Sequence, residues 1–308
     1  MKLRHVIEQY VTLKQSLGFR FRTERRILQG FGQAMGKITL GQVSPVAVRT
    51  YLDGPGPVTS YWMRKWGTLR GLYRFALARG LARRCPLPLS TPKVAVPFTP
   101  YIYSQPELRR LLQAITPERT KGLSPQTMRT LLLLLYGAGL RLSEALKLEP
   151  ADVDVQERLL QVRQSKFFKS RLVPIGPKLA KVLEDYQTER PAGDGSHRRF
   201  LRANKGTPVS GATAERIFRA LRLAADVKRP EGCRYQPRLH DLRHAMATHC
   251  LVNGYRTGAD VQALLVNLSA YLGHVDLSGT QKYLTMTPDL RQQASARFAR
   301  YALGGSHE

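Results

Sequence analysis

The sequence is poor in cysteine and lacks long apolar runs. Its three cysteines, Cys85, Cys233 and Cys250, are odd in number and scattered, so we expect free thiols and neither a disulfide framework nor a CxxC zinc site. The apolar run LLLLLYGAGL from Leu131 contains glycines and is shorter than the roughly 20 residues that a membrane span needs. The first residues, MKLRHVIEQY, have no secretory core, which predicts a cytoplasmic protein with no membrane partner.

Acidic residues are also scarce, which gives the chain a strongly positive charge. Asp and Glu number 22 against 49 Lys and Arg, for a net charge of +27. Such an excess destabilises a compact chain by self-repulsion unless a polyanion neutralises it, and nucleic acid is the usual polyanion. Residues 1–95 carry +14 and the remaining 213 residues carry +13, so both halves are expected to face phosphates. Membrane binding is the weaker interpretation, because no short amphipathic helix separates basic from apolar faces.

A proline-rich segment divides the chain into two predicted domains. Residues 85–100, CPLPLSTPKVAVPFTP, contain five prolines and no helical periodicity, as expected for a linker. We predict a helical domain over residues 1–95, a linker over 96–103 and a mixed domain over 104–308. A chain of 308 residues is long enough for two such domains, each with its own core.

The first domain is predicted to be helical throughout. Apolar residues recur at helical spacing, and Ser44-Pro45 is a start signal for one of the helices. A longer helix carries an aromatic stripe in which Trp62 and Trp66 lie among basic residues. The two indoles could stack on DNA bases. Such a stripe is more often core, and we expect the core position here.

The second domain is predicted to combine helices with a small β-sheet. Ser104 and Glu107 form a capping box at the start of one helix. The strings RLLQV and RLVPI flank SKFFKS, which predicts a β-hairpin with a six-residue tip. Further helices are expected over roughly 125–136, 178–188 and 213–225, from His240, and from Thr287 onward. The predicted fold class is therefore mainly α with a small β-sheet.

Five short strings hold the candidate functional residues. They are GLRLSEALKL with Arg141, SKFFKSRLVPI with Lys166, HDLRH with His240 and Arg243, LGH with His274, and QKYL with Tyr283. Taken singly, each has an ordinary explanation, such as a solvated arginine or a packed tyrosine. His240 and His244 could ligate zinc, but no third ligand is apparent. The sequence has no GxxxxGK[ST] loop and no carboxylate cluster for magnesium, so we expect no metal ion and no cofactor.

Taken together and in this order, the strings resemble the tyrosine recombinase, or phage integrase, family of site-specific DNA recombinases. GLRLSEALKL, HDLRHAMATH and LGHVDLSGTQKYL look like the signature boxes of that family. The resemblance implies a helical core-binding domain and an α+β catalytic domain that form a C-shaped clamp on DNA. It also implies catalytic roles for six residues: Arg141, Lys166, His240, Arg243, His274 and Tyr283.

The chemistry of these residue types suits the transfer of a DNA strand to tyrosine. Two guanidiniums can grip the phosphate oxygens, and a phenol with a pKa near 10 needs a cationic site and a base. His240 is the candidate base, and His274 is expected to hydrogen-bond a phosphate oxygen. Lys166 suits protonation of the leaving 5′-oxygen, although Lys169 shares the hairpin and could take that role. The sequence thus predicts an enzyme that cleaves and rejoins DNA through a 3′-phosphotyrosyl intermediate.

The resemblance also implies partners and leaves two alternative functions. Its members act on double-stranded DNA as a dimer per site and a tetramer in synapsis, alone or with sister recombinases. We predict that residues 288–302 bridge protomers instead of packing on their own domain. Residues 254–271 are longer than in compact members and are similar to transposon-encoded recombinases. The alternatives are a non-catalytic architectural DNA-binding protein and a type IB topoisomerase-like enzyme. His244 and His249 are assigned structural roles.

Overall fold

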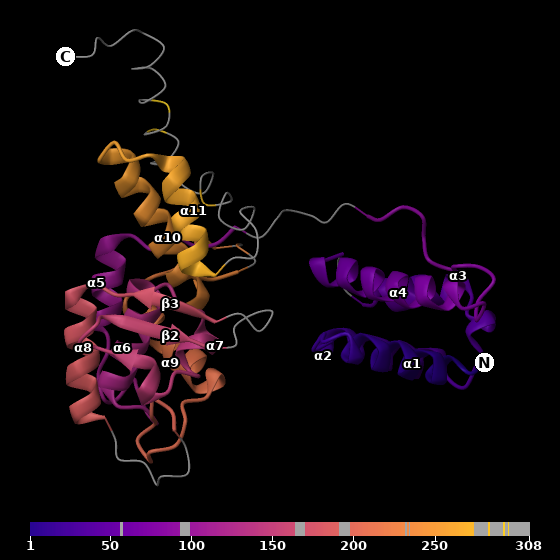
Figure 1. The fold of residues 1–308 in the computed structure, drawn as a ribbon, viewed down its shortest axis with the longest axis horizontal. Helices are drawn as coiled ribbons and strands as arrows, with labels where there is room; N and C mark the ends of the chain where they lie inside the picture. Colours follow the sequence, from indigo (N-terminus) through magenta and orange to yellow (C-terminus); the bar gives the residue numbers. More distant parts are fainter. Residues whose placement is uncertain are drawn as a thin grey trace. The chain divides into compact units, whose positions relative to one another are not determined.

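The computed structural model describes residues 1–308 except 56–57, 93–98, 164–169, 191–197, 232, 234, 274–282, 284–291, 293–294 and 296–308. The chain forms two compact units, Met1–Phe98 and Thr99–Glu308, and each is described by itself (Figure 1). The predicted fold class, mainly α with a small β-sheet, is confirmed. Within the described residues, no helix is both long and apolar enough to cross a membrane.

The described part of the first unit packs its helices around one core. Its elements are α1 (Leu3–Ser16), α2 (Arg22–Met35), the 3-10 turn η1 (Leu40–Gln42), α3 (Pro45–Asp53) and α4 (Ser60–Ala78). Helix α4 contacts each of the other three helices. Leu3, Phe31, Leu52 and Leu69 come from four different helices and are all fully buried. The apolar faces that the sequence predicts therefore meet at a single core.

The two tryptophans of α4 face into this unit. Trp62 is 2 % exposed and donates its indole N–H to Asp53 Oδ1 at 2.8 Å. Trp66 is partly buried and donates its indole N–H to the carbonyl of Pro88 at 3.2 Å. Because both N–H groups have partners within the unit, the core interpretation fits better than base stacking. Tyr61, the residue before Trp62 on α4, is 52 % exposed and lies outside this core.

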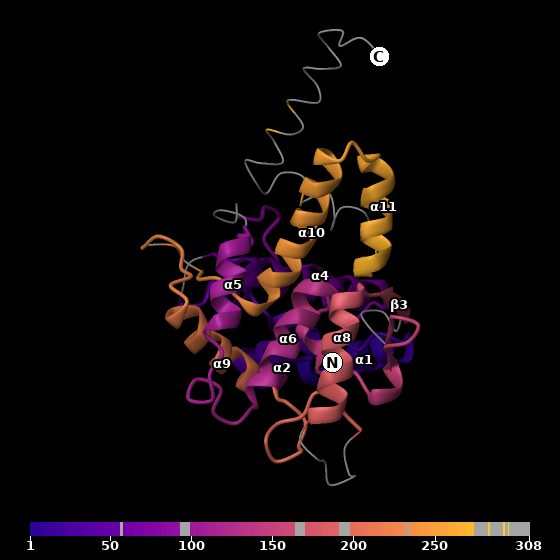
Figure 2. The same ribbon diagram turned by 90° about the vertical axis from the view of Figure 1, so that its left-hand side faces the viewer.

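The second unit is built around a helix that is apolar on nearly all sides, α6 (Pro125–Gly137). The other helical elements are α5 (Gln105–Gln113), α7 (Leu142–Ala145), η2 (Pro150–Asp152), α8 (Pro177–Glu189), α9 (Gly211–Ala224), α10 (Leu239–Arg256) and α11 (Val261–Leu272). Helix α6 contacts α7, α8 and α10. Helices α10 and α11 lie side by side at one end of the unit (Figures 1 and 2). A helix that is hydrophobic all round belongs at the centre of a core, and α6 occupies that place.

Serine side chains begin four of the described helices, α3, α5, α6 and α9. Ser44 accepts the Ala47 N–H at 3.1 Å at the start of α3, and Ser124 starts α6 in the same way. At the start of α5, the backbone N–H and the hydroxyl of Ser104 both donate to Glu107 Oε2 at 2.8 Å. The capping box predicted from the sequence is therefore present.

A three-stranded antiparallel sheet follows η2 in the chain. Its strands are β1 (Val153–Asp154), β2 (Leu159–Val162) and β3 (Arg171–Pro174), and β2 pairs with both neighbours. The register sets Leu160 opposite Val173, and both side chains are buried. The predicted pairing of the two hairpin strands is confirmed. Strand β1 was not predicted, because two residues are too few to show an alternating pattern. The hairpin tip with Lys166 and Lys169 lies outside the described residues.

A matched pair of leucines on α9 tests the assignment of the second core. Leu221 is 0 % exposed and Leu223 is 65 % exposed. We expect Leu221→Ala to lower the free energy of unfolding of the second unit by roughly 3 kcal/mol, because it leaves a cavity, and Leu223→Ala to change it by less than about 0.5 kcal/mol. Urea unfolding followed by circular dichroism measures both values.

Both tryptophans of the chain lie in the first unit, so tryptophan fluorescence provides an internal control. The fluorescence transition is expected at the same urea concentration in the wild type and both variants. A Leu221→Ala protein as stable as the wild type would contradict the core assignment.

Candidate active site

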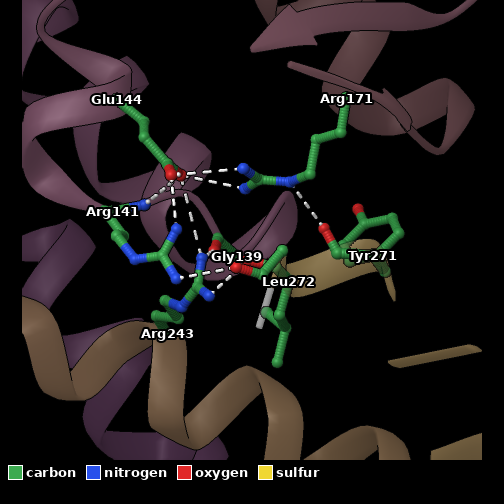
Figure 3. Close-up of polar contacts among 8 residues, drawn as sticks. Gly139, Arg141, Glu144, Arg171, Arg243, Tyr271 and Leu272 are labelled. Carbon is green, nitrogen blue, oxygen red and sulfur yellow. Dashed lines mark hydrogen bonds and ion pairs between the residues drawn. The ribbon is translucent and has the colours of Figure 1, made fainter. Parts of the chain in front are cut away.

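The predicted arginines Arg141 and Arg243 come together although 102 positions separate them in the chain. After α6 the backbone turns at Gly139, which has a φ of +59°, and Arg141 follows as the residue before α7. Arg243 lies within α10, which packs on α6. Arg243 Nη1 donates to the Gly139 carbonyl at 2.6 Å, so the turn that presents Arg141 also holds Arg243. Figure 3 shows both guanidiniums beside the carboxylate of Glu144.

Glu144 is the anion on which this site converges. Arg141 contacts it twice, with the backbone N–H 3.0 Å from Oε2 and Nη1 2.5 Å from Oε1. Arg171, the first residue of β3, forms a fork with Nη1 3.2 Å from Oε1 and Nη2 2.9 Å from Oε2. Arg243 Nη1 lies 3.8 Å from Oε2. Three guanidiniums, from the residue before α7, from α10 and from β3, therefore share the Glu144 carboxylate, whose side chain is 5 % exposed.

The end of α11 supplies a second set of acceptors for the same three arginines. Three consecutive carbonyl oxygens accept hydrogen bonds here. Tyr271 O accepts from Arg171 Nε at 2.9 Å, and Leu272 O accepts from Arg243 Nη2 at 2.5 Å. Gly273 O accepts from Arg141 Nη2 at 3.1 Å. The final carbonyls of a helix have no partner within the helix and lie at the negative end of its dipole. Consecutive carbonyls at this helix end thus bind three different guanidiniums.

The pKa values of both Glu144 and Arg243 are lowered, for different reasons. Burial alone would raise the pKa of Glu144, but hydrogen bonds and positive charge from Arg171 and Arg141 outweigh it and hold the pKa at about 2. Burial and the neighbouring charge of Arg141 lower the pKa of Arg243 to about 10. Glu144 is therefore ionised and Arg243 protonated at neutral pH. Positive charge remains in excess, which suits the site to a second anion such as a phosphate.

Tyr283 lies buried beside these arginines. Its side chain is 1 % exposed, and its hydroxyl oxygen is 3.0 Å from His244 Nδ1. Burial raises the pKa of the phenol, while the positive charges of Arg243 and Arg141 and a hydrogen bond with Arg243 lower it and offset part of the increase. The phenol is thus protonated at neutral pH and needs a base before it can attack.

His240 has the properties of a proton acceptor. It lies on α10 one turn before His244, and the two rings meet edge to face with centroids 4.8 Å apart. Burial, followed by the charge of Arg243, lowers the pKa of His240, so the imidazole is neutral at physiological pH. In the part of the chain that the structure describes, no group of three or more His, Cys, Asp or Glu side chains could hold a metal ion.

The structure does not describe all of the remaining residues that were predicted to be functional. Lys166 and His274 lie outside the described residues, as does most of 288–302. Neither Glu144 nor Arg171 was predicted to have a role, and His244 was predicted to be structural. All three nevertheless contact predicted catalytic residues or their partners. Glu144 had a weak signal, its spacing of three residues after Arg141. Arg171 had none, since it is one of 49 basic residues.

Comparisons with known proteins agree with the motifs. A family model described as "Phage integrase family" matches residues 103–289. The putative integrase/recombinase y4rB of Sinorhizobium fredii is 32 % identical, covering 96 % of this chain and 97 % of that protein. The tyrosine recombinase XerC of Chlorobaculum tepidum is 33 % identical, covering 73 % of this chain and 68 % of that protein. The chain belongs to the phage integrase family, and the family prediction made from the sequence is confirmed.

Solved structures share the fold at low sequence identity. The Tn1549 transposon integrase in complex with transposon right end DNA has a TM-score of 0.70 at 16 % identity, covering 96 % of this chain and 99 % of that chain. A lambda integrase tetramer bound to a Holliday junction has a TM-score of 0.69 at 17 % identity, covering 92 % of this chain and 77 % of that chain. At these identities the likeness concerns the fold alone.

The pKa of Glu144 predicts how the stability of the second unit depends on pH. Its fall from the ordinary 4.5 to about 2 corresponds to roughly 3 kcal/mol of native-state stabilisation. A lowered folded-state pKa gives stability that is present above the unfolded-state pKa and is lost as pH falls toward the folded-state value. We therefore expect Glu144→Gln to be less stable than the wild type by roughly 3 kcal/mol at pH 7, with the difference shrinking between about pH 4.5 and pH 2.

Urea unfolding by circular dichroism at several pH values measures this difference. Glu184→Gln is the control, because Glu184 forms an exposed ion pair with Lys181 on α8. A pH-independent gap between Glu144→Gln and the wild type would contradict the ionised state of Glu144.

Proposed function

We propose that this protein cleaves and rejoins DNA strands at specific sites, with Tyr283 as the nucleophile and a 3′-phosphotyrosyl intermediate. The observation that carries the proposal is that Arg141 and Arg243 converge within a few ångströms of one carboxylate, with the phenol of Tyr283 close enough for their charge to act on it. The protein is a tyrosine recombinase by family, and the six motif residues are its proposed catalytic set.

In the proposed reaction the scissile phosphate binds to the two arginines. Their forked donors neutralise the charge that builds up on the non-bridging oxygens, and each donor of this kind is worth roughly 2.7–4 kcal/mol. The Tyr283 oxygen forms a bond to phosphorus while the bond to the 5′-oxygen breaks. His240 accepts the phenolic proton, directly or through its neighbour His244. The phosphotyrosyl bond conserves the energy of the cleaved bond, so rejoining requires neither a metal ion nor a nucleotide.

Two further roles in this proposal belong to residues outside the described ranges. Lys166 protonates the leaving 5′-oxygen, and His274 donates a hydrogen bond to a non-bridging oxygen. Both assignments come from the family motifs. His274 directly follows Gly273 in the sequence, and the Gly273 carbonyl accepts from Arg141 Nη2. Since the Tyr283 side chain is 1 % exposed, binding of DNA must also uncover the phenol.

Double-stranded DNA is the proposed partner, and the positive charge of both parts of the chain supports this. In the proposal, residues 1–95 form a core-binding domain and residues 104–308 form the catalytic domain of a C-shaped clamp. A dimer occupies each recombination site and a tetramer forms the synapse. We place the protein in the cytoplasm, in contact with nucleoid DNA.

A nicked suicide duplex tests the nucleophile. The duplex carries a sequence that the protein itself selects from a random pool, and nicks at successive positions release a short strand after cleavage. We expect the wild type to form a protein–DNA adduct that survives SDS, and Tyr283→Phe to form none, because it lacks the attacking oxygen. Tyr255→Phe, which packs against the same apolar cluster, is expected to keep the adduct. An adduct in Tyr283→Phe would place the nucleophile elsewhere.

A truncation tests the proposed role of residues 288–302 as a bridge between protomers. Ending the chain after Thr287 is expected to leave binding of single molecules to DNA nearly unchanged and to abolish assembly of the tetramer. Mobility-shift titration and analytical ultracentrifugation on a duplex with the selected site separate the two effects. Synapsis at the wild-type level would rule out the bridge.

A further inference from the structure

We infer that Arg171 is a positioning residue that sets the geometry of the Arg141–Arg243 pair by joining β3, Glu144 and the end of α11. This inference rests on the proposed function, since it assumes that the two arginines hold the scissile phosphate. Figure 3 shows Arg171 reaching Glu144 from a different direction than the other two guanidiniums, with its third contact on Tyr271.

All three nitrogens of the Arg171 guanidinium donate hydrogen bonds. Nη1 and Nη2 each donate to one oxygen of Glu144, at 3.2 Å and 2.9 Å, and Nε donates to the Tyr271 carbonyl at 2.9 Å. Such a fork fixes the carboxylate in both position and rotation. A lysine carries the same charge but cannot make this planar set of contacts. The orientation of Glu144 therefore depends on the guanidinium itself.

Gly273, at the C-terminal end of α11, lies directly against the guanidinium of Arg171. A Cβ atom at this position would lie 2.9 Å from Arg171 Nη1 and 3.1 Å from Cδ and Cζ, and Gly273 has a φ of +64°. The guanidinium thus lies against a residue that only glycine fills without strain. The carbonyl of Gly273 accepts from Arg141 Nη2. Arg171 consequently constrains both groups that hold Arg141, the Glu144 carboxylate and the Gly273 carbonyl.

The contacts of Arg171 distinguish its role from that of a phosphate ligand. Its Nη1 and Nη2 hold the two oxygens of Glu144 and its Nε donates to the Tyr271 carbonyl, so all three guanidinium nitrogens are engaged within the protein. Arg171 is also the first residue of the strand that follows the hairpin tip, so the same contacts fix one end of the segment that carries Lys166. Loss of Arg171 would therefore alter the placement of reacting groups and leave the DNA-binding surface intact.

The test compares adduct formation with DNA affinity in the full-length protein. Arg171→Lys and Arg171→Gln are expected to form the Tyr283 adduct about 10–100-fold more slowly in single-turnover reactions with saturating protein, because a misplacement of about 1 Å can cost about 100-fold in rate. Their affinity for the selected duplex, measured by mobility shift at fixed salt, is expected to stay within about twofold of the wild type, in contrast to loss of a phosphate contact.

Arg199→Gln is the matched control. Arg199 also donates to a carbonyl and to a carboxylate, those of Lys147 and Glu149, but lies outside the three-arginine cluster, so the adduct rate is expected to be unchanged. A double-mutant cycle measures whether the effects of Arg171→Gln and Glu144→Gln on the adduct rate are coupled. General destabilisation by each substitution would not produce such coupling. If Arg171 acts through Glu144, the variant with both Arg171→Gln and Glu144→Gln is no slower than the slower single variant.

The outcomes separate this inference from the proposed function. Wild-type adduct rates in a folded Arg171→Lys or Arg171→Gln protein overturn the inference and leave the role of Tyr283 standing. Multiplicative rate losses in the double variant also overturn it. If Arg171→Gln does not fold by circular dichroism, the charge-conserving Arg171→Lys decides the question. A wild-type protein that forms no adduct contradicts the proposed function itself.

Discussion

The site depends on one buried carboxylate that holds three cations together. Without Glu144, the positive charges of Arg141, Arg171 and Arg243 would repel one another in a largely buried region, where water screens charge less than at the surface. With it, each guanidinium has one anionic and at least one carbonyl partner, and a net positive charge is left over. Because this arrangement is complete before any phosphate arrives, its electrostatics are preorganised, which is the form of stabilisation that speeds reactions most.

Local sequence signals predicted most of the helices but not α11, and family motifs predicted the two central arginines. The serine caps of α3 and α5 are short-range features, so the residues around Ser44 and Ser104 were enough to locate them. The hairpin was predictable from two flanking apolar strings, whereas β1 was too short to recognise. Arg141 and Arg243 were identified because they lie in sequence motifs that occur in the order typical of the family. Composition alone cannot distinguish two residues among 49 basic ones.

The supporting residues could not be predicted because their partners are distant in sequence. Arg171 meets Glu144 across 27 positions and Tyr271 across 100, and no local pattern encodes such a contact. From the sequence, His244 was assigned a structural role in α10. Its contact with the Tyr283 phenol, 39 positions away, is visible only in the folded chain. Lys166 and His274 stay predictions from the motifs.

The helix end at Tyr271, Leu272 and Gly273 restricts how the length of α11 can change. Each residue added to an α-helix rotates the residues after it by about 100° and advances them by about 1.5 Å along the axis. One inserted residue would point all three carbonyls away from their arginines at the same time, whereas a substitution disturbs one of them. Among related proteins, insertions and deletions between α10 and the active site are therefore expected in the loop before Val261. A change of length there does not rotate the end of α11 relative to the rest of that helix.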